Sequence, residues 1–277
     1  MVPAVKILTP AHPLAPTLAH LRATIERLER GSAPHGLNPM PFGVPALDDA
    51  MPQGGLARAA LHEVAGAGPD REHGAVGARF AAGILARLDG PVLWVVGSTL
   101  APPFAPGLAS AGLHPDRVVF AEAGRDATLL VMEEGLRHHG LAGVVAELAG
   151  PLSLTASRRL QLAAEATGIM AILLHRQYRS ALSEAAGATA AVTRWRIAAL
   201  PSGPALPHAP EVPGLARARW RVDLTRCRGG KTGSWIMEAC DASGRLGLAA
   251  PLAHEAAMPG RPAYQPVPQP SHRLGVA

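Results

Sequence analysis

The stretch Leu61-His-Glu-Val-Ala-Gly66-Ala-Gly-Pro-Asp-Arg-Glu-His-Gly74-Ala-Val76 joins a short apolar run to the start of a helical pattern. The run ends in glycine, as a buried strand often does, and a helix is expected over about residues 74–88. A connection from a strand into a helix is a common place for phosphate binding, because backbone N–H groups point out of the helix N-terminus. The stretch therefore predicts an α/β fold with a loop at the position of a phosphate site.

The alternation of strand and helix continues along the chain. Further short apolar runs lie at 92–97, 118–120, 143–147 and 169–174, and helical patterns lie around 127–139 and 153–167. Continuous apolar strands that alternate with helices predict a mainly parallel central sheet flanked by helices on both faces. After Arg194 three strands follow without helices, at 195–200, 218–227 and 234–241, and Gly229-Gly-Lys-Thr-Gly233 predicts an antiparallel hairpin between the last two.

The predicted domain occupies residues 36–249, with different sequence on either side. An amphipathic N-terminal helix is expected over 14–30, within an arm of residues 1–35. Its apolar positions recur at steps of three and four and include Leu18, Leu21, Ile25 and Leu28. This helix either packs on the core of the domain or serves as a docking element for a partner. Residues 250–277 are rich in proline and alanine without periodicity, which predicts a disordered tail.

The composition limits the class of protein. The chain has 277 residues, a formal charge of +5, two cysteines and only 4% aromatic residues. Two cysteines exclude a disulfide framework and fit a reducing, cytoplasmic compartment. The apolar stretch 90–115 is broken by five prolines, so we expect a buried strand and a loop there rather than a membrane span. Residues 174–231 carry ten Lys and Arg against three acidic residues, which indicates either a solvated surface or a face for DNA or an acidic partner.

A literal phosphate-loop ending, Gly230-Lys231-Thr232, is better explained as a hairpin turn. A phosphate loop needs a glycine five positions before its second glycine, and that position is Thr225. The loop must also lead from a strand into a helix, whereas these residues lie between two predicted strands.

The second candidate lies at the expected position but lacks the chemistry. Its positions are Gly66, Gly68, Gly74, Ala75 and Val76. Ala75 replaces the lysine that would neutralise the phosphates, and Val76 replaces the hydroxyl that would hold Mg²⁺. Asp70 and Glu72 add negative charge where phosphates would lie. We therefore expect a vestigial loop, no catalytic residues, no ATP turnover, no cofactor and no metal.

The approach to this loop resembles that of RecA-type proteins. The resemblance is carried by Phe42-Gly-Val-Pro-Ala-Leu47-Asp48, Met51-Pro-Gln-Gly54-Gly55-Leu56 and the strand ending Glu63-Val-Ala-Gly66. It covers roughly residues 40–241 and implies a RecA-like core with an added antiparallel hairpin.

The later strands follow in RecA order but depart from the family's catalytic residues. Gly97 is followed by Ser98 and Thr99, with no acid at the position of the catalytic glutamate. Glu147 stands at the Walker B position, where aspartate is usual. His175 ends the strand that usually carries a glutamine sensing the γ-phosphate.

Within that superfamily the chain is similar to the ImuA proteins. The similarity rests on Leu21-Arg-Ala-Thr-Ile-Glu-Arg-Leu-Glu29, on the entry motif Phe42–Asp48, on the vestigial loop, and on the hairpin from Trp220-Arg-Val-Asp to Trp235-Ile-Met-Glu238. It implies a non-catalytic accessory protein of the DNA-damage-inducible (SOS) translesion-synthesis mutasome, associated with the nucleoid after damage. The implied partners are an ImuB-type inactive Y-family polymerase and an error-prone replicative polymerase α subunit, with RecA and DNA as further partners. The alternatives are a RecA-class DNA-dependent ATPase and a SulA-like inhibitor of cell division.

The basic block supplies the candidate contacts for DNA or a partner. These are Arg176, Arg179, Arg226, Arg228 and Lys231. Because side chains alternate along a strand, Arg217, Arg219 and Arg221 should share one face of the hairpin. Arg226 and Arg228 should then lie on the other face, unless a bulge intervenes.

Overall fold

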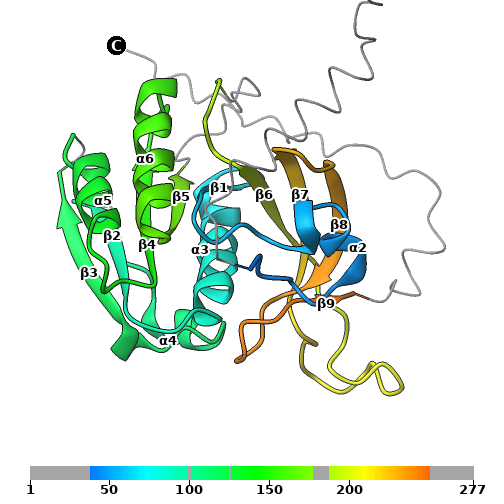
Figure 1. The fold of residues 1–277 in the computed structure, drawn as a ribbon. Helices are drawn as coiled ribbons and strands as arrows, with labels where there is room; N and C mark the ends of the chain where they lie inside the picture. The colour runs from blue at the N-terminus through cyan, green and yellow to red at the C-terminus, as the bar shows by residue number, and fades with distance from the viewer. Residues whose placement is uncertain (1–37, 99–100, 125, 177–186, 250–277) are drawn as a thin grey trace, which may run out of the picture.

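The computed structural model describes residues 38–98, 101–124, 126–176 and 187–249. They form a nine-stranded sheet in the order β3-β2-β4-β5-β1-β6-β7-β8-β9 (Figure 1). The strands are β1 (Leu61–Gly66), β2 (Val92–Gly97), β3 (Val118–Ala123), β4 (Gly143–Ala149), β5 (Met170–Arg176), β6 (Thr193–Leu200), β7 (Arg219–Cys227), β8 (Gly233–Glu238) and β9 (Gly247–Leu248). The helices are α2 (Pro45–Asp48), α3 (Asp70–Ala86), α4 (Ala105–Ala109), α5 (Thr128–Leu136) and α6 (Leu154–Thr167), with 3₁₀ turns at Pro52–Gly54 and Pro115–Arg117.

The sheet has a parallel and an antiparallel part. Strands β1 to β6 pair in parallel, whereas β6–β7, β7–β8 and β8–β9 pair antiparallel. The predicted mainly parallel sheet with an added hairpin is confirmed, and it agrees with a RecA-like core. The turn of the hairpin is the G-K-T segment, where Gly229 has φ +73° and the Lys231 N–H donates to the Ala50 carbonyl. The second candidate phosphate loop is therefore the one that leads from a strand into a helix.

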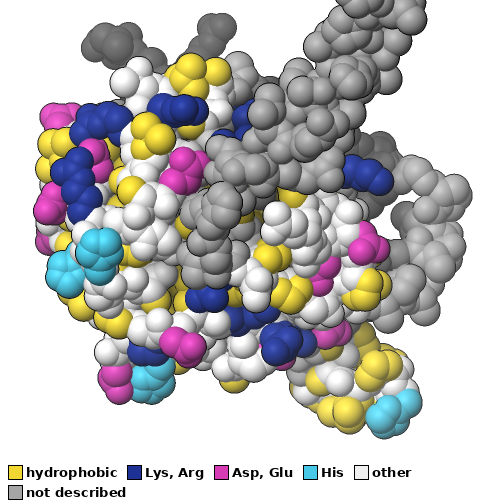
Figure 2. All heavy atoms as spheres, viewed as in Figure 1, with side chains coloured by type: hydrophobic (Ala, Val, Ile, Leu, Met, Phe, Trp, Pro, Cys, Tyr) yellow, Lys and Arg dark blue, Asp and Glu magenta, His cyan; other side chains and the backbone are white. Residues whose placement is uncertain are grey.

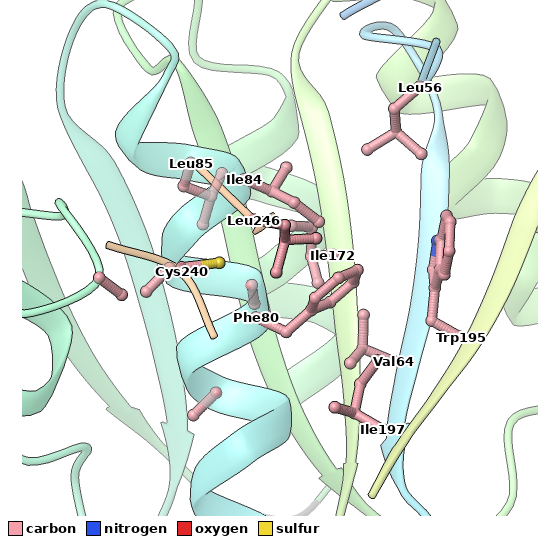
Figure 3. Close-up of a cluster of buried hydrophobic side chains, with 14 of the residues drawn as sticks. Leu56, Val64, Phe80, Ile84, Leu85, Ile172, Trp195, Ile197, Cys240 and Leu246 are labelled. Carbon is pink, nitrogen blue, oxygen red and sulfur yellow. The ribbon is translucent and has the colours of Figure 1, made fainter. Parts of the chain in front are cut away.

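Helices α3 and α4 cover one face of the sheet and enclose the larger core. Phe80 of α3 lies against Trp195 of β6, with ring centroids 5.4 Å apart (Figure 3). Buried hydrogen bonds link β6 to β1. The Trp195 indole N–H donates to the Thr193 hydroxyl, which also lies 2.7 Å from the His62 Nδ1 atom. The other imidazole nitrogen of His62 lies 2.8 Å from the Ala57 carbonyl oxygen, so both ring nitrogens of the neutral imidazole have hydrogen-bond partners.

Helices α5 and α6 cover the opposite face, over β2, β4, β5 and β1. Met132 and Leu136 of α5 and Leu160 of α6 form a second core with the strands beneath them. In Figure 1 these two helices lie at one end of the sheet, and β7, β8 and β9 lie at the other. In the described part of the chain no helix packs on the α5–α6 side of β7 and β8.

The structure differs from the sequence expectation in several boundaries. Helix α3 begins at Asp70, four residues before the expected start. The stretch predicted as a loop after β2 contains the short helix α4, and strand β9 was not predicted. Strands β3 and β4 run on to Ala123 and Ala149, past the expected ends.

The connection between β6 and β7 projects from the body of the protein (lower right in Figures 1 and 2). It is closed at its base by a bridge between Pro204 and Leu215. Exposed hydrophobic side chains gather on it, including Leu206, Val212 and Leu215 (Figure 2).

The predicted arm of residues 1–35, the helix over 14–30 and the tail of residues 250–277 lie outside the described residues. Among the helices that are described, none has the length and apolar character needed to cross a bilayer.

Candidate functional site

The connection between β1 and α3 is only three residues long, from Ala67 to Pro69. Pro69 precedes the helix, and its carbonyl accepts the N–H groups of Glu72 and His73 at 3.0 Å. The positions aligned with the end of a phosphate loop, Gly74, Ala75 and Val76, lie beyond the first helical turn. Their N–H groups therefore belong to the hydrogen bonding of the helix.

His73 fills the space under this short connection. A Cβ on Gly66 would lie 2.8 Å from the His73 Cβ, and a Cβ on Gly68 would lie 2.9 Å from its Cδ2 atom. The Ala199 N–H donates to the His73 Nδ1 atom at 3.2 Å, which fixes the ring. Both glycines thus allow the first turn of α3 to pack closely on the end of β1.

The side of the sheet that carries α3 holds an ion cluster at the same place. The Nε atom of Arg176 lies 3.1 Å from Asp70 Oδ2 and 3.4 Å from Glu147 Oε2. The Trp94 indole N–H donates to Glu147 Oε1 at 2.8 Å, and Arg176 also donates to the Gly74 carbonyl at 3.4 Å. We call Asp70, Trp94, Glu147 and Arg176 the Arg176 cluster.

The Arg176 cluster is well shielded from solvent. The side chain of Glu147 is 1% exposed, that of Asp70 10% and that of Arg176 19%. Burial raises the pKa of Glu147, and the negative charge of Asp70 adds to the rise, whereas Arg176 and Trp94 act in the opposite direction. The Arg176 guanidinium therefore compensates the Asp70 and Glu147 carboxylates, which would otherwise repel each other where little water reaches them.

A second charged network lies on the opposite face of the sheet, around Glu63. Glu63 Oε2 lies 3.1 Å from His175 Nε2 and accepts the Arg194 Nε–H at 2.8 Å, while Oε1 accepts the Thr189 hydroxyl. Burial alone would raise the pKa of Glu63, but the bonds from His175, Thr189 and Arg194 lower it to about 2. The strand-end glutamate was part of the sequence motif, but its partners are more than 110 residues away and gave no local signal.

The predicted basic contacts do not form one surface. Arg176 belongs to the Arg176 cluster, Arg228 lies 3.6 Å from Glu165 of α6, and Lys231 is exposed in the hairpin turn. Arg226 is exposed on β7. Arg179 and the helix positions Leu18, Leu21, Ile25 and Leu28 lie outside the described residues.

A β-bulge changes the face on which Arg226 lies. Arg194 pairs with Arg226, but the next residue, Trp195, pairs with Leu224, so Thr225 is an extra residue on β7. Directly paired residues point to the same side of a sheet, and Trp195 and Leu224 are in the core. Arg226 therefore shares the opposite face with Arg221, and the expected separation of the two sets of arginines does not hold.

The other arginines predicted to share a face with Arg221 have different surroundings. Arg219 is only 5% exposed, and Arg217 lies 3.3 Å from Glu238 and 3.6 Å from Asp241. Within the described ranges there is no group of three or more His, Cys, Asp or Glu side chains that could hold a metal ion.

The comparisons with known proteins identify the family. No protein-family model matches the chain. The chain is 41% identical over 210 residues to Protein ImuA of Caulobacter vibrioides, in strain NA1000 / CB15N and equally in strain ATCC 19089 / CIP 103742 / CB 15. The alignment covers 73% of this chain and 83% of each of those proteins. The chain therefore belongs to the ImuA family, which associates it with SOS mutagenesis.

Proposed function

We propose that the protein acts without nucleotide turnover, as a RecA-like accessory component of the SOS translesion-synthesis mutasome. Its partners in this proposal are an ImuB-type inactive Y-family polymerase and the error-prone replicative polymerase α subunit, with RecA and DNA as further contacts. Family membership supports the association with mutagenesis. The non-catalytic role rests on the vestigial site.

The observation that carries the proposal is the position of Arg176. Its guanidinium pairs with Asp70 at the start of α3 and with Glu147 at the Walker B position. A nucleotide with Mg²⁺ would need free N–H groups at a loop, a lysine and a hydroxyl. Here the N–H groups of Glu72 and His73 bond to the Pro69 carbonyl within the first helical turn, and Ala75 and Val76 lie inside the helix. The residues present do not fit the nucleotide.

Nucleotide binding by the purified full-length chain tests this proposal. We expect no binding of a fluorescent ATP analogue at micromolar concentrations and no hydrolysis above background, with or without single-stranded DNA. RecA measured in parallel is the positive control. Micromolar affinity together with DNA-stimulated turnover would favour the RecA-class ATPase instead.

A double variant tests whether the backbone geometry or only the missing side chains prevent nucleotide binding. Ala75→Lys with Val76→Thr restores the two absent groups but leaves them within α3, beyond its first turn. We therefore expect this double variant to bind no nucleotide either. Gain of micromolar ATP binding by the variant would show that the two side chains alone were lacking.

The accessory role predicts that surface residues matter for mutagenesis. Arg226→Ala with Arg228→Ala should lower damage-induced mutation frequency without unfolding the domain, because neither side chain is in the core. Arg137→Ala with Arg158→Ala removes the same charge from the residue after α5 and from α6, and is the charge-matched control. Unchanged mutation frequency in the first variant would exclude this part of the hairpin from the function.

A further inference from the structure

One sheet face, which no helix of the described residues covers, carries arginines from two neighbouring strands. In the strand register, Arg196 of β6 lies opposite Asp223 of β7. Arg221 and Arg226 lie on β7 on either side of Asp223, and all three arginines are on the same side of the sheet. We call Arg196, Arg221 and Arg226 the arginine face. It lies on the side of the sheet that carries α5 and α6, but those helices pack on the other end of the sheet (Figure 1).

Two of these three guanidinium groups lack a counter-charge among the described residues. Arg196 donates to the Ala67 carbonyl at 3.2 Å, and Arg226 donates to the Ala191 carbonyl at 3.1 Å. Neither forms an ion pair with any residue of the described chain. A guanidinium has five N–H donors, so one backbone bond leaves most of its donors for other acceptors.

The remaining charges near the arginine face are paired with each other. Arg221 lies 3.2 Å from Asp223, which also accepts the Ser234 hydroxyl at 2.6 Å. Arg194, directly opposite Arg226, is held by Glu63 at 2.8 Å. Like charges placed opposite each other on neighbouring strands are unfavourable unless compensated. The Glu63 carboxylate compensates Arg194 but not Arg226, so an anion bound beside Arg226 would compensate the second positive charge.

The chemistry of the surrounding side chains distinguishes between anionic partners. The register places Ala198 and Ile236 on the same side as Arg221, and no aromatic residue joins them. Trp195 and Trp220 point into the core on the other side. Protein interfaces have an apolar, aromatic centre, whereas DNA interfaces are polar and positive. Proteins that bind single strands use exposed rings for base stacking, which the arginine face lacks.

We propose that the arginine face binds the phosphate backbone of double-stranded DNA without reading its sequence. The inference deepens the proposed function, since it gives the DNA contact of that proposal a place and a strand form. Arg196 and Arg226 supply the two uncompensated charges, and each neutralises one phosphate. Arg221 can contact a third phosphate if its ion pair with Asp223 is replaced by one with the DNA.

Fluorescence anisotropy of the full-length chain with a labelled 20-base-pair duplex, from 25 to 200 mM salt, tests the proposal. Each phosphate contact contributes about 0.9 to the slope of log affinity against log salt. Loss of two contacts in Arg196→Gln with Arg226→Gln should therefore make the slope shallower by about 1.8. Between 50 and 200 mM salt this corresponds to about 12-fold less loss of affinity than in the wild type. Glutamine retains a donor for each backbone carbonyl, and circular dichroism checks the fold.

A control and two competitors decide the outcome. Arg137→Gln with Arg158→Gln removes the same charge from the residue after α5 and from α6, and should leave the slope unchanged. An equal change of the salt slope in the control variant, or no binding of the duplex by the wild type at 25 mM salt, would overturn the proposal. Tighter binding of a 20-nucleotide single strand, or equal binding of polyglutamate, would overturn the assignment to duplex DNA. None of these results depends on nucleotide, so the accessory role can stand if this inference fails.

Discussion

Removal of the Arg176 guanidinium should be among the most damaging single changes to this domain. Arg176→Ala leaves Asp70 and Glu147 without their shared cation, at 10% and 1% exposure. Breaking a buried pair by removal of one partner costs about 3–5 kcal/mol, because an uncompensated charge stays behind. Domains of this kind are stable by only about 5–15 kcal/mol. We therefore expect a large drop in the urea midpoint at pH 8.

The dependence of this defect on pH identifies its cause. Glu147 already has a raised pKa from burial, and the variant removes the arginine that opposes the rise. With a folded-state pKa above the ordinary 4.5, the folded protein binds more protons than the unfolded chain in the interval between the two values. Stability in that interval falls as pH rises and recovers as pH falls. The variant should therefore lose less stability, relative to the wild type, at pH 5.5 than at pH 8.

A matched double variant completes the test. Arg176→Met with Glu147→Gln replaces the buried pair by neutral side chains, and the carbonyl of the introduced glutamine can still accept from the Trp94 indole. Such replacements are often neutral for stability. Asp70 stays without its cation in this variant, so we expect the double variant to regain part, but not all, of the stability lost in Arg176→Ala. A loss below about 1 kcal/mol in Arg176→Ala at pH 8, or a loss independent of pH, would refute the assignment of Arg176 as the cation that holds the two carboxylates.

Two further predictions concern the buried core. The pKa of His62 falls from 6.5 to about 4 because burial disfavours its charged form, so unfolding takes up a proton between these values. Stability should drop by about 3 kcal/mol as pH falls from 6.5 to 4, and urea titrations of His62→Gln should lack this component. Gly83→Ala would place a Cβ within 2.2 Å of the Cys240 thiol and should cost about 1–3 kcal/mol in thermal unfolding. Gly124→Ala, whose new Cβ has no described atom within 4 Å apart from its chain neighbours, should leave the midpoint nearly unchanged. An equal shift in both variants would contradict the packing argument.

The elements of the sheet could be predicted because their signals are local. Each parallel strand is a short apolar run bounded by glycine or polar residues, and β2 was predicted with its observed bounds. The predicted start of α3 is four residues too late. The residues Pro69 and Asp70 are themselves a helix start, with proline before the first turn and an acid within it. Here the local capping chemistry, rather than the motif frame, sets the boundary.

The site residues were predicted less well because their partners are distant in sequence. Arg176 was expected at a surface, but it meets Asp70 and Glu147, which come from a helix start and a neighbouring strand. The face of Arg226 depends on a single extra residue, Thr225, and a shift of one residue reverses the side of every later side chain on a strand. No spacing in the chain marks a bulge, so the arginine face could be found only from the register of β6 and β7.

The Arg176 cluster also bears on how such a protein could be regulated. A ligand shifts a conformational equilibrium only through different affinity for the two states. In RecA-type proteins the nucleotide site is where such a ligand would act, whereas here Arg176, Asp70 and Glu147 are held together by the chain itself. On the proposed function, any change of state must therefore come from partners bound at the surface. The arginine face runs along β6 and β7, and the projecting β6–β7 connection continues from one end of these strands, so DNA and a protein partner could bind one antiparallel unit at once.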